Sequence, residues 1–260
     1  MVNSGFKLAL QLYSLRAEMA EDLLHAVKTA ADMGFEGVEF AGFYDKSAYE
    51  WREILDRFGL EVAGAHTPLK SLYGDQLDKT VEEHKVLSNR NLIVPSVPHE
   101  LVKSVSDWVG FASTLNTLAG QLERHGMRVG YHCHASDFKA VDGRAPWDIV
   151  FTNTSSVVVM QVDTGNAMHA GLTAGEVINL IKRYPGRAYS VHLKDHSRQR
   201  GFKVVLGEGD MDWDELLLAL KRYGGTRWLI VEQEEYPYTP PAESVRRSLE
   251  NLRDRLSTVG

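Results

Sequence analysis

The chain has 260 residues, a formal net charge of −6, 43% hydrophobic residues and 25% charged residues. Charges of both signs are interspersed, which counts against nucleic acid or an anionic membrane surface as a partner, since either favours a basic stripe. One cysteine, Cys133, excludes an internal disulfide. Met1 to Lys7 contains no apolar run long enough for a signal peptide, and no stretch approaches the roughly 20 apolar residues of a membrane helix. We therefore expect a soluble, cytoplasmic protein.

Short apolar or alternating runs take turns along the chain with segments of helical spacing. Such a rhythm is typical of strands joined by crossover helices. The predicted strands are Leu8–Tyr13, Gly37–Phe40, Glu61–His66, Asn91–Ser96, Arg128–His134, Val157–Asp163, Ala188–Leu193 and Trp228–Glu232.

Apolar stripes with helical spacing lie between these strands and after the last one. The stripes begin at Trp51, Trp108, Val177, Trp213 and Val245. Glycines suited to the left-handed position that ends a helix follow several predicted helices; they are Gly34, Gly59, Gly126, Gly186 and Gly224. Eight strand–helix repeats of about 30 residues predict one (β/α)8 barrel domain over residues 1–260. An open doubly wound sheet is the alternative, but the glycine-rich loop that often follows its first strand is missing.

Ionisable residues gather where four successive strands in the second half of the chain end. His132 and His134 share a face of one strand, and Asp163, His192 and Glu232 end the next three. Because parallel barrel strands end at the same rim, these side chains should converge. Histidine nitrogens with carboxylate oxygens suit Mn²⁺, Zn²⁺ or Co²⁺. The alternative is histidines bonded to backbone or water and carboxylates in structural ion pairs.

These residues lie in segments that resemble the sugar phosphate isomerase/epimerase family, part of the xylose-isomerase-like barrel superfamily. That superfamily includes inosose dehydratase-like, ketose 3-epimerase-like and endonuclease IV-like proteins. The resemblance covers nearly the whole chain. Its segments are Gln11–Ser14, Gly37–Phe40, Gly64–His66, Gly130–His134, Val162–Asn166, His169–Gly171, Val191–Asp195, Gly207–Gly209 and Ile230–Gln233.

The resemblance implies one divalent metal ion, which could be Mn, Zn, Co or Mg. Family members hold it through Glu, Asp, His and Glu, and the last three correspond to Asp163, His192 and Glu232. His132 stands where the common pattern has the first glutamate, and His134 is the alternative ligand on the same strand. Because the first of the two glutamates is replaced and only Glu232 remains, this chain lacks the pair of glutamates that a two-glutamate epimerase mechanism uses.

The activity that the resemblance implies is a sugar or polyol isomerase or epimerase. A metal would polarise the substrate carbonyl, acidify the neighbouring C–H and stabilise the enediolate. Glu232 is the predicted metal ligand and base, and His134 is the predicted acid or second base. Lys194 is predicted to stabilise the enediolate, with an ion pair to Asp195 or Glu208 as the alternative. Loss of a β-hydroxyl in the same site would make the protein a dehydratase.

Four residues from other strands and loops are predicted to contact the substrate: Gln11, Glu39, His66 and His169. For Glu39, orienting a ligand histidine or a lysine is the favoured role. The sequence lacks a glycine-rich phosphate cradle, which favours a non-phosphorylated substrate. Other residues receive structural interpretations: buried for Cys133, exposed for His25, His84 and His125, and packed in the helix shell for Trp147, Trp213 and Trp228.

Two rival functions stay open. A DNA-repair endonuclease of the endonuclease IV type would need about three metals and basic or wedge loops for bent DNA, which the acidic charge disfavours. A barrel that binds a sugar without catalysis is the other rival, because fold alone does not determine function. The sequence leaves the oligomeric state open, a homo-oligomer included.

Overall fold

The computed structural model describes residues 5–259, so most of the N-terminal segment considered as a signal peptide lies outside the described residues. Within this range eight strands form one parallel sheet in the order β6-β5-β4-β3-β2-β1-β8-β7. They are β1 (Lys7–Gln11), β2 (Gly37–Phe40), β3 (Glu61–His66), β4 (Asn91–Val94), β5 (Arg128–His132), β6 (Val159–Gln161), β7 (Ser190–Leu193) and β8 (Trp228–Val231).

The sheet curls into a nearly closed barrel whose seam lies between β6 and β7. The two strands are joined by a parallel bridge between Asp163 and His192. The His192 N–H also donates to the Val162 carbonyl at 2.9 Å. The predicted (β/α)8 barrel is therefore confirmed, and its seam runs through two of the predicted metal ligands.

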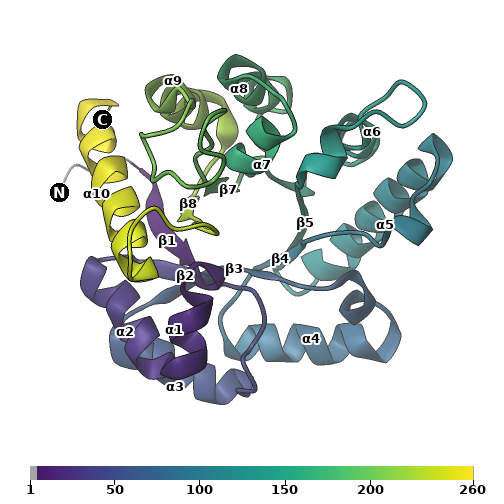
Figure 1. Cartoon of the computed structure of the whole chain (residues 1–260). Coiled ribbons are helices and arrows are strands. Elements are labelled where there is room, and N and C mark those ends of the chain that lie inside the picture. The colour runs from purple at the N-terminus through teal and green to yellow at the C-terminus, as the bar shows by residue number, and fades with distance from the viewer. Residues whose placement is uncertain (1–4, 260) are drawn as a thin grey trace.

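Helices form an outer ring around the strands (Figure 1). The α-helices are α1 (Arg16–Glu21), α2 (Leu23–Met33), α3 (Ala48–Phe58), α4 (Gly74–Val86), α5 (Val105–Glu123), α6 (Pro146–Asn153), α7 (Thr164–His169), α8 (Ala174–Arg183), α9 (Trp213–Ala219) and α10 (Pro241–Val259). Short turns are η1 (Leu12–Leu15), η2 (Leu69–Leu72), η3 (His99–Leu101), η4 (Ala135–Phe138) and the π-helical η5 (Leu220–Gly224). Among the described helices, none is long and apolar enough to cross a membrane.

Predicted glycines end α2 and α3, whereas the end of η5 differs from its prediction. Gly34 and Gly59 end α2 and α3 with φ of 89° and 67°, in the left-handed region where a Cβ is unfavourable. At the end of η5 the left-handed residue is Gly225, with φ of 64°, and not the predicted Gly224. The π-helical turn is wider than an α-helical turn, which moves the end of the helix along the chain.

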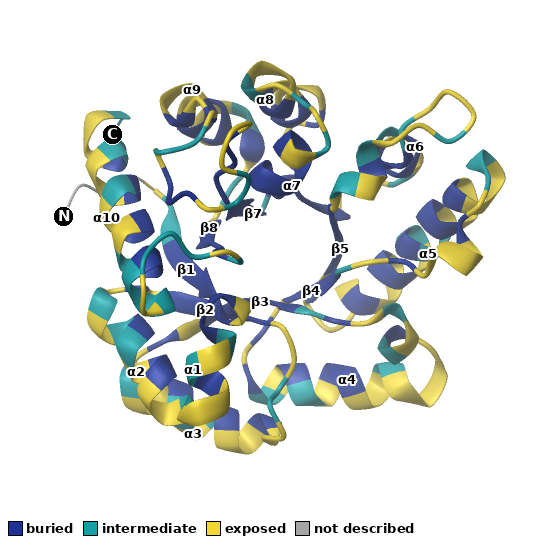
Figure 2. Cartoon of the chain, viewed as in Figure 1, coloured by how far each residue is buried: buried dark blue, intermediate teal, exposed yellow. Residues whose placement is uncertain are grey.

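The strands and the inward sides of the helices consist mostly of buried residues, and the outer helix faces are exposed (Figure 2). The predicted stripes of α5, α8, α9 and α10 are buried. Trp228 differs from its prediction, because it packs with Ala9, Ala63 and Ile230 in a cluster separate from the main core. It shares its strand face with Ile230, and β8 residues on that face point into the barrel. The prediction that Trp228 packs in the helix shell is therefore wrong.

His84 on α4 also differs from its prediction. Its side chain is buried, and its Nδ1 accepts a hydrogen bond from Asn89 Nδ2 at 3.0 Å. Burial lowers the pKa of His84 to about 4, so the ring is neutral near neutral pH. A polar residue on a helix is not always exposed, because a nearby turn can supply its hydrogen-bond partner.

Candidate metal centre

Four side chains meet at the rim where the strands end. His132 comes from β5 and His192 from β7; Glu232 directly follows β8, and Asp163 lies two residues after the end of β6. One ligand atom from each lies within 4.8 Å of the others, and all four residues are buried. His192 Nδ1 lies 3.1 Å from Glu232 Oε2. Metal–ligand bonds of about 2.1 Å allow neighbouring donor atoms to lie roughly this far apart, so the cluster has the dimensions of a cation site.

The two histidines each direct one ring nitrogen toward Asp163. His192 Nε2 is bound to the Glu39 carboxylate, and His192 Nδ1 faces Asp163 Oδ2 at 3.9 Å. His132 Nδ1 lies 3.0 Å from Gln161 Oε1, and His132 Nε2 faces Asp163 Oδ2 at 4.0 Å. Metal-binding histidines commonly have their second ring nitrogen held by a carboxylate or carbonyl in this way.

Burial and neighbouring charges strongly shift the pKa values of the side chains in the cluster. Burial alone would lower the pKa of His192, but the Glu39 and Glu232 carboxylates on either side outweigh burial and raise that pKa to about 10. Burial works against ionisation of Glu232, yet Lys194 and His192 hold its pKa well below the ordinary value. Burial lowers the pKa of His132 well below its ordinary value, so this ring is neutral and able to bind a metal.

Lys194 is the second cation of the cluster, and its side chain is only 2% exposed. Its Nζ lies 2.9 Å from Asp163 Oδ2, 3.2 Å from Glu232 Oε2 and 2.9 Å from Glu234 Oε1. The sequence predicted Asp195 or Glu208 as the alternative ion-pair partner of Lys194. Among the described residues its partners are instead these three carboxylates.

One oxygen at the centre fits a cation particularly well. Asp163 Oδ2 is buried and accepts no hydrogen bond of good geometry within residues 5–259, although Lys194 Nζ is close. Burial raises the pKa of Asp163, and the Lys194 ammonium opposes that change. Buried carboxylate oxygens normally have hydrogen-bond partners or bind a metal. The donor set therefore fits a divalent cation held by His132, Asp163, His192 and Glu232.

Comparison with known proteins assigns the family. Residues 27–255 match the xylose isomerase-like TIM barrel family. The chain belongs to this family. An inosose dehydratase from Erwinia tasmaniensis is 25% identical over 247 residues, which cover 81% of this chain and 82% of that protein.

Solved structures show the same fold. A sugar phosphate isomerase/epimerase from Parabacteroides distasonis superimposes with a TM-score of 0.79 and 22% identity, over 97% of this chain and 95% of that one. An L-ribulose 3-epimerase superimposes with a TM-score of 0.72 and 15% identity, over 98% of this chain and 95% of that one.

Three of the predicted substrate-contacting residues lie in or against the cluster. Glu39 is fully buried and accepts hydrogen bonds from His192 and, at 2.9 Å, from Gln11 Nε2. Gln11 is therefore occupied by Glu39 in this structure. The His66 ring stacks on His192 with centroids 5.3 Å apart, and its side chain is 14% exposed. His66 also forms a second, overlapping cluster with His132 and His192.

The other two predicted histidines lie nearer to solvent. His134 is exposed, and its ring centroid is 5.0 Å from that of His132. His134 lines a hollow of about 500 Å³ that Trp108 and Asp137 also line. His169 is exposed and packs 5.0 Å from Phe202, whose ring lies 5.1 Å from Lys194 Nζ.

Asp195, next to Lys194, organises the loop that follows β7. Its Oδ2 accepts hydrogen bonds from the N–H groups of Gly207 and Gly209, at 2.8 and 3.0 Å, and from Trp213 Nε1 at 2.9 Å. A Cβ at Gly209 would lie 2.1 Å from Asp195 Oδ1, so this close approach requires glycine. Asp195 thus holds the loop at the rim instead of neutralising Lys194.

Gln161 is a site residue that the sequence analysis did not identify. It is fully buried, and its amide contacts His66, His132, Glu39 and Ser190. The available signal was its position two residues before Asp163, because alternate residues of a barrel strand face the same side.

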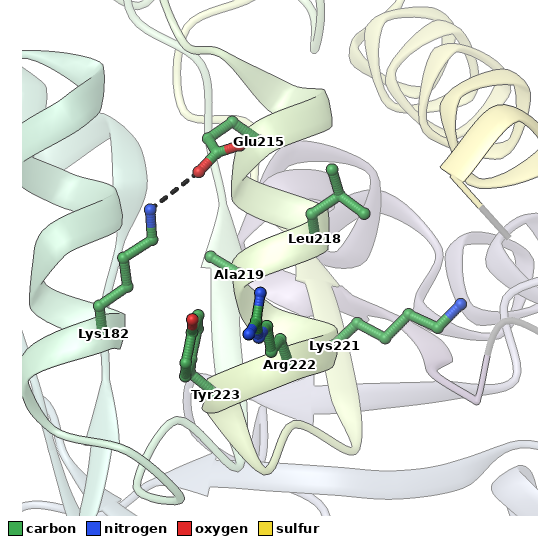
Figure 3. A pocket seen from close by; sticks show the side chains of 7 residues that line it. All are labelled: Lys182, Glu215, Leu218, Ala219, Lys221, Arg222 and Tyr223. Carbon is green, nitrogen blue, oxygen red and sulfur yellow. Dashed lines mark hydrogen bonds and ion pairs between the residues drawn. The ribbon is translucent and has the colours of Figure 1, made fainter.

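A further hollow lies on the outside of the barrel, between α8 and α9 (Figure 3). It has a volume of about 410 Å³ and is lined by Leu218, Tyr223 and several charged side chains. Lys182 and Glu215 form an ion pair of 2.8 Å across it. None of its described lining residues belongs to the metal cluster, so it has no part in the candidate site.

Proposed function

We propose that the chain is a divalent-metal-dependent enzyme that removes a proton next to the carbonyl of a small sugar or polyol. The buried cluster of His132, Asp163, His192 and Glu232 carries this proposal. Membership of the xylose isomerase-like family and similarity to an inosose dehydratase support it. Two imidazole ligands favour Mn²⁺, Zn²⁺ or Co²⁺ over Mg²⁺, which prefers oxygen ligands.

The ligand residues and their neighbours divide the chemistry among them. A divalent cation, when bound, would polarise the substrate carbonyl and acidify the adjacent C–H. Glu232 is ionised and can accept a proton, but its low pKa makes it a weak base. Such a base suits a C–H bond that is already acidified.

Two groups at the rim can complete the proton transfer. Lys194 carries an ammonium that can donate a hydrogen bond to a substrate oxygen on which negative charge develops. His134 is exposed beside His132 and can give a proton to, or take one from, the substrate.

Two outcomes follow from the same first step. Loss of a β-hydroxyl gives a dehydration, which the inosose dehydratase relative favours. Return of the proton to another atom or face gives an isomerisation or epimerisation. His132 replaces one of the two carboxylates that a two-glutamate epimerase would use, so we place dehydration of a polyhydroxy ketone first.

The test begins with metal content and continues with proton exchange. The protein is stripped with EDTA, reloaded with Mn²⁺, Zn²⁺ or Co²⁺, and incubated in D₂O with inososes and ketoses. NMR should show deuterium entering next to the carbonyl, or loss of that C–H with formation of an unsaturated ketone. If the protein binds none of the three ions, the proposal has lost its central feature.

We also propose that residues 1–260 act as one barrel domain on a small molecule in the cytoplasm, with nucleic acid and membrane excluded as partners. The hollow beside His134, with a volume of about 500 Å³, is of a size for a sugar. Analytical ultracentrifugation would establish whether the protein is a homo-oligomer.

A further inference from the structure

We propose that Gln161 is a positioning residue that presets the ring orientation and tautomer of His132 before a metal binds. This inference rests on the proposed function, because it concerns how the proposed ligands are held. Gln161 occupies the centre of the network, and it binds neither the cation nor the substrate in this proposal.

The Gln161 amide has partners at both of its ends. Its Oε1 lies 3.0 Å from His132 Nδ1 and 3.1 Å from His66 Nε2. Its Nε2 donates to Glu39 Oε1 at 2.8 Å and to Ser190 Oγ at 2.9 Å. The side chain is completely buried, so water cannot replace these partners.

Glu39 determines which way the amide points. An ionised carboxylate only accepts hydrogen bonds, so the Gln161 NH₂ group must face it. A flipped amide would place Oε1 about 2.8 Å from a carboxylate oxygen and would lose a charge-assisted hydrogen bond of roughly 1.5–3 kcal/mol.

The tautomer of His132 follows from this orientation. Because Gln161 Oε1 can only accept, His132 Nδ1 must carry the hydrogen. The lone pair is then on His132 Nε2, which faces Asp163 Oδ2 at 4.0 Å. The other oxygen of Glu39 binds His192 Nε2 and leaves His192 Nδ1 toward the cluster. Glu39 and Gln161 therefore orient both histidines as one connected unit.

The variant Gln161→Met keeps the length of the side chain and removes both hydrogen-bonding ends. We expect the affinity for Mn²⁺ or Zn²⁺, measured by isothermal titration calorimetry, to fall about 10–100-fold. The matched control is Asn89→Leu, which removes another buried amide whose partners are His84 and the Asn91 backbone. The control should lose stability and keep its metal affinity within threefold. Equal affinities in the wild type and a folded Gln161→Met variant would overturn the inference.

A measurement on the wild type covers the case in which Gln161→Met does not fold. Nitrogen-15 chemical shifts of metal-free protein should show His132 with hydrogen on Nδ1 and a free Nε2. The opposite tautomer would refute the positioning role. If His132 has the expected tautomer but no divalent ion binds, the proposed function fails while the positioning role stands. If the wild type binds metal and the variant binds it equally well, only the positioning role fails.

Discussion

Replacing Lys194 by methionine should destabilise the metal-free protein strongly. The ammonium is 2% exposed and lies within 3.2 Å of oxygens of Asp163, Glu232 and Glu234. Methionine fills similar space but leaves two buried carboxylates without their shared cation. Removing one partner of a buried ion pair costs about 3–5 kcal/mol, so we expect the free energy of unfolding to fall by about that amount.

Lys182→Met is the matched control, because it makes the same substitution in an exposed pair. The side chains of Lys182 and Glu215 are 40% and 49% exposed. Figure 3 shows the two side chains facing each other. Solvent screens such a pair, and its loss should cost about 1 kcal/mol or less. Urea unfolding at pH 7.5 in the presence of EDTA measures both variants.

Added Mn²⁺ extends this test to the metal site. A divalent cation would supply the positive charge that Lys194→Met lacks, so it should stabilise this variant more than the wild type. A loss of less than about 1 kcal/mol for Lys194→Met, equal to the Lys182→Met control, would refute the argument that Lys194 neutralises the buried acids.

Three other perturbations test separate parts of the structure. His192→Ala should abolish divalent-metal binding in calorimetry while circular dichroism still reports a folded barrel; unchanged affinity would count against the proposed ligands. Gly64→Ala would place a Cβ 2.7 Å from Glu39 Oε1, so Glu39 must shift and metal affinity should fall about tenfold or more. The neutral His84 ring stabilises the fold above pH 6.5, and this contribution, up to about 3 kcal/mol, should be lost between pH 6.5 and pH 4. Urea unfolding at several pH values should show a smaller pH dependence in His84→Gln than in the wild type, and an equal dependence would contradict the assignment.

The sequence by itself determined the architecture, because strand and helix periods are local properties of the chain. The apolar stripes that begin at Trp108 and Val177 are buried as predicted. The rim position of His132, Asp163, His192 and Glu232 could also be predicted, since parallel barrel strands all end on the same side. Strand alternation further placed Cys133 on the face opposite the histidines, and it is buried.

Only the tertiary structure decided which groups these side chains contact. Glu39 and His192 are 153 positions apart in the chain and yet share a hydrogen bond. Strands that are adjacent in space but distant in the sequence also supply the Asp163 and Glu232 partners of Lys194. The same is true of the contacts that Gln161 makes. Local periodicity specifies which face a residue occupies, whereas hydrogen bonds and ion pairs depend on the register and closure of the whole barrel.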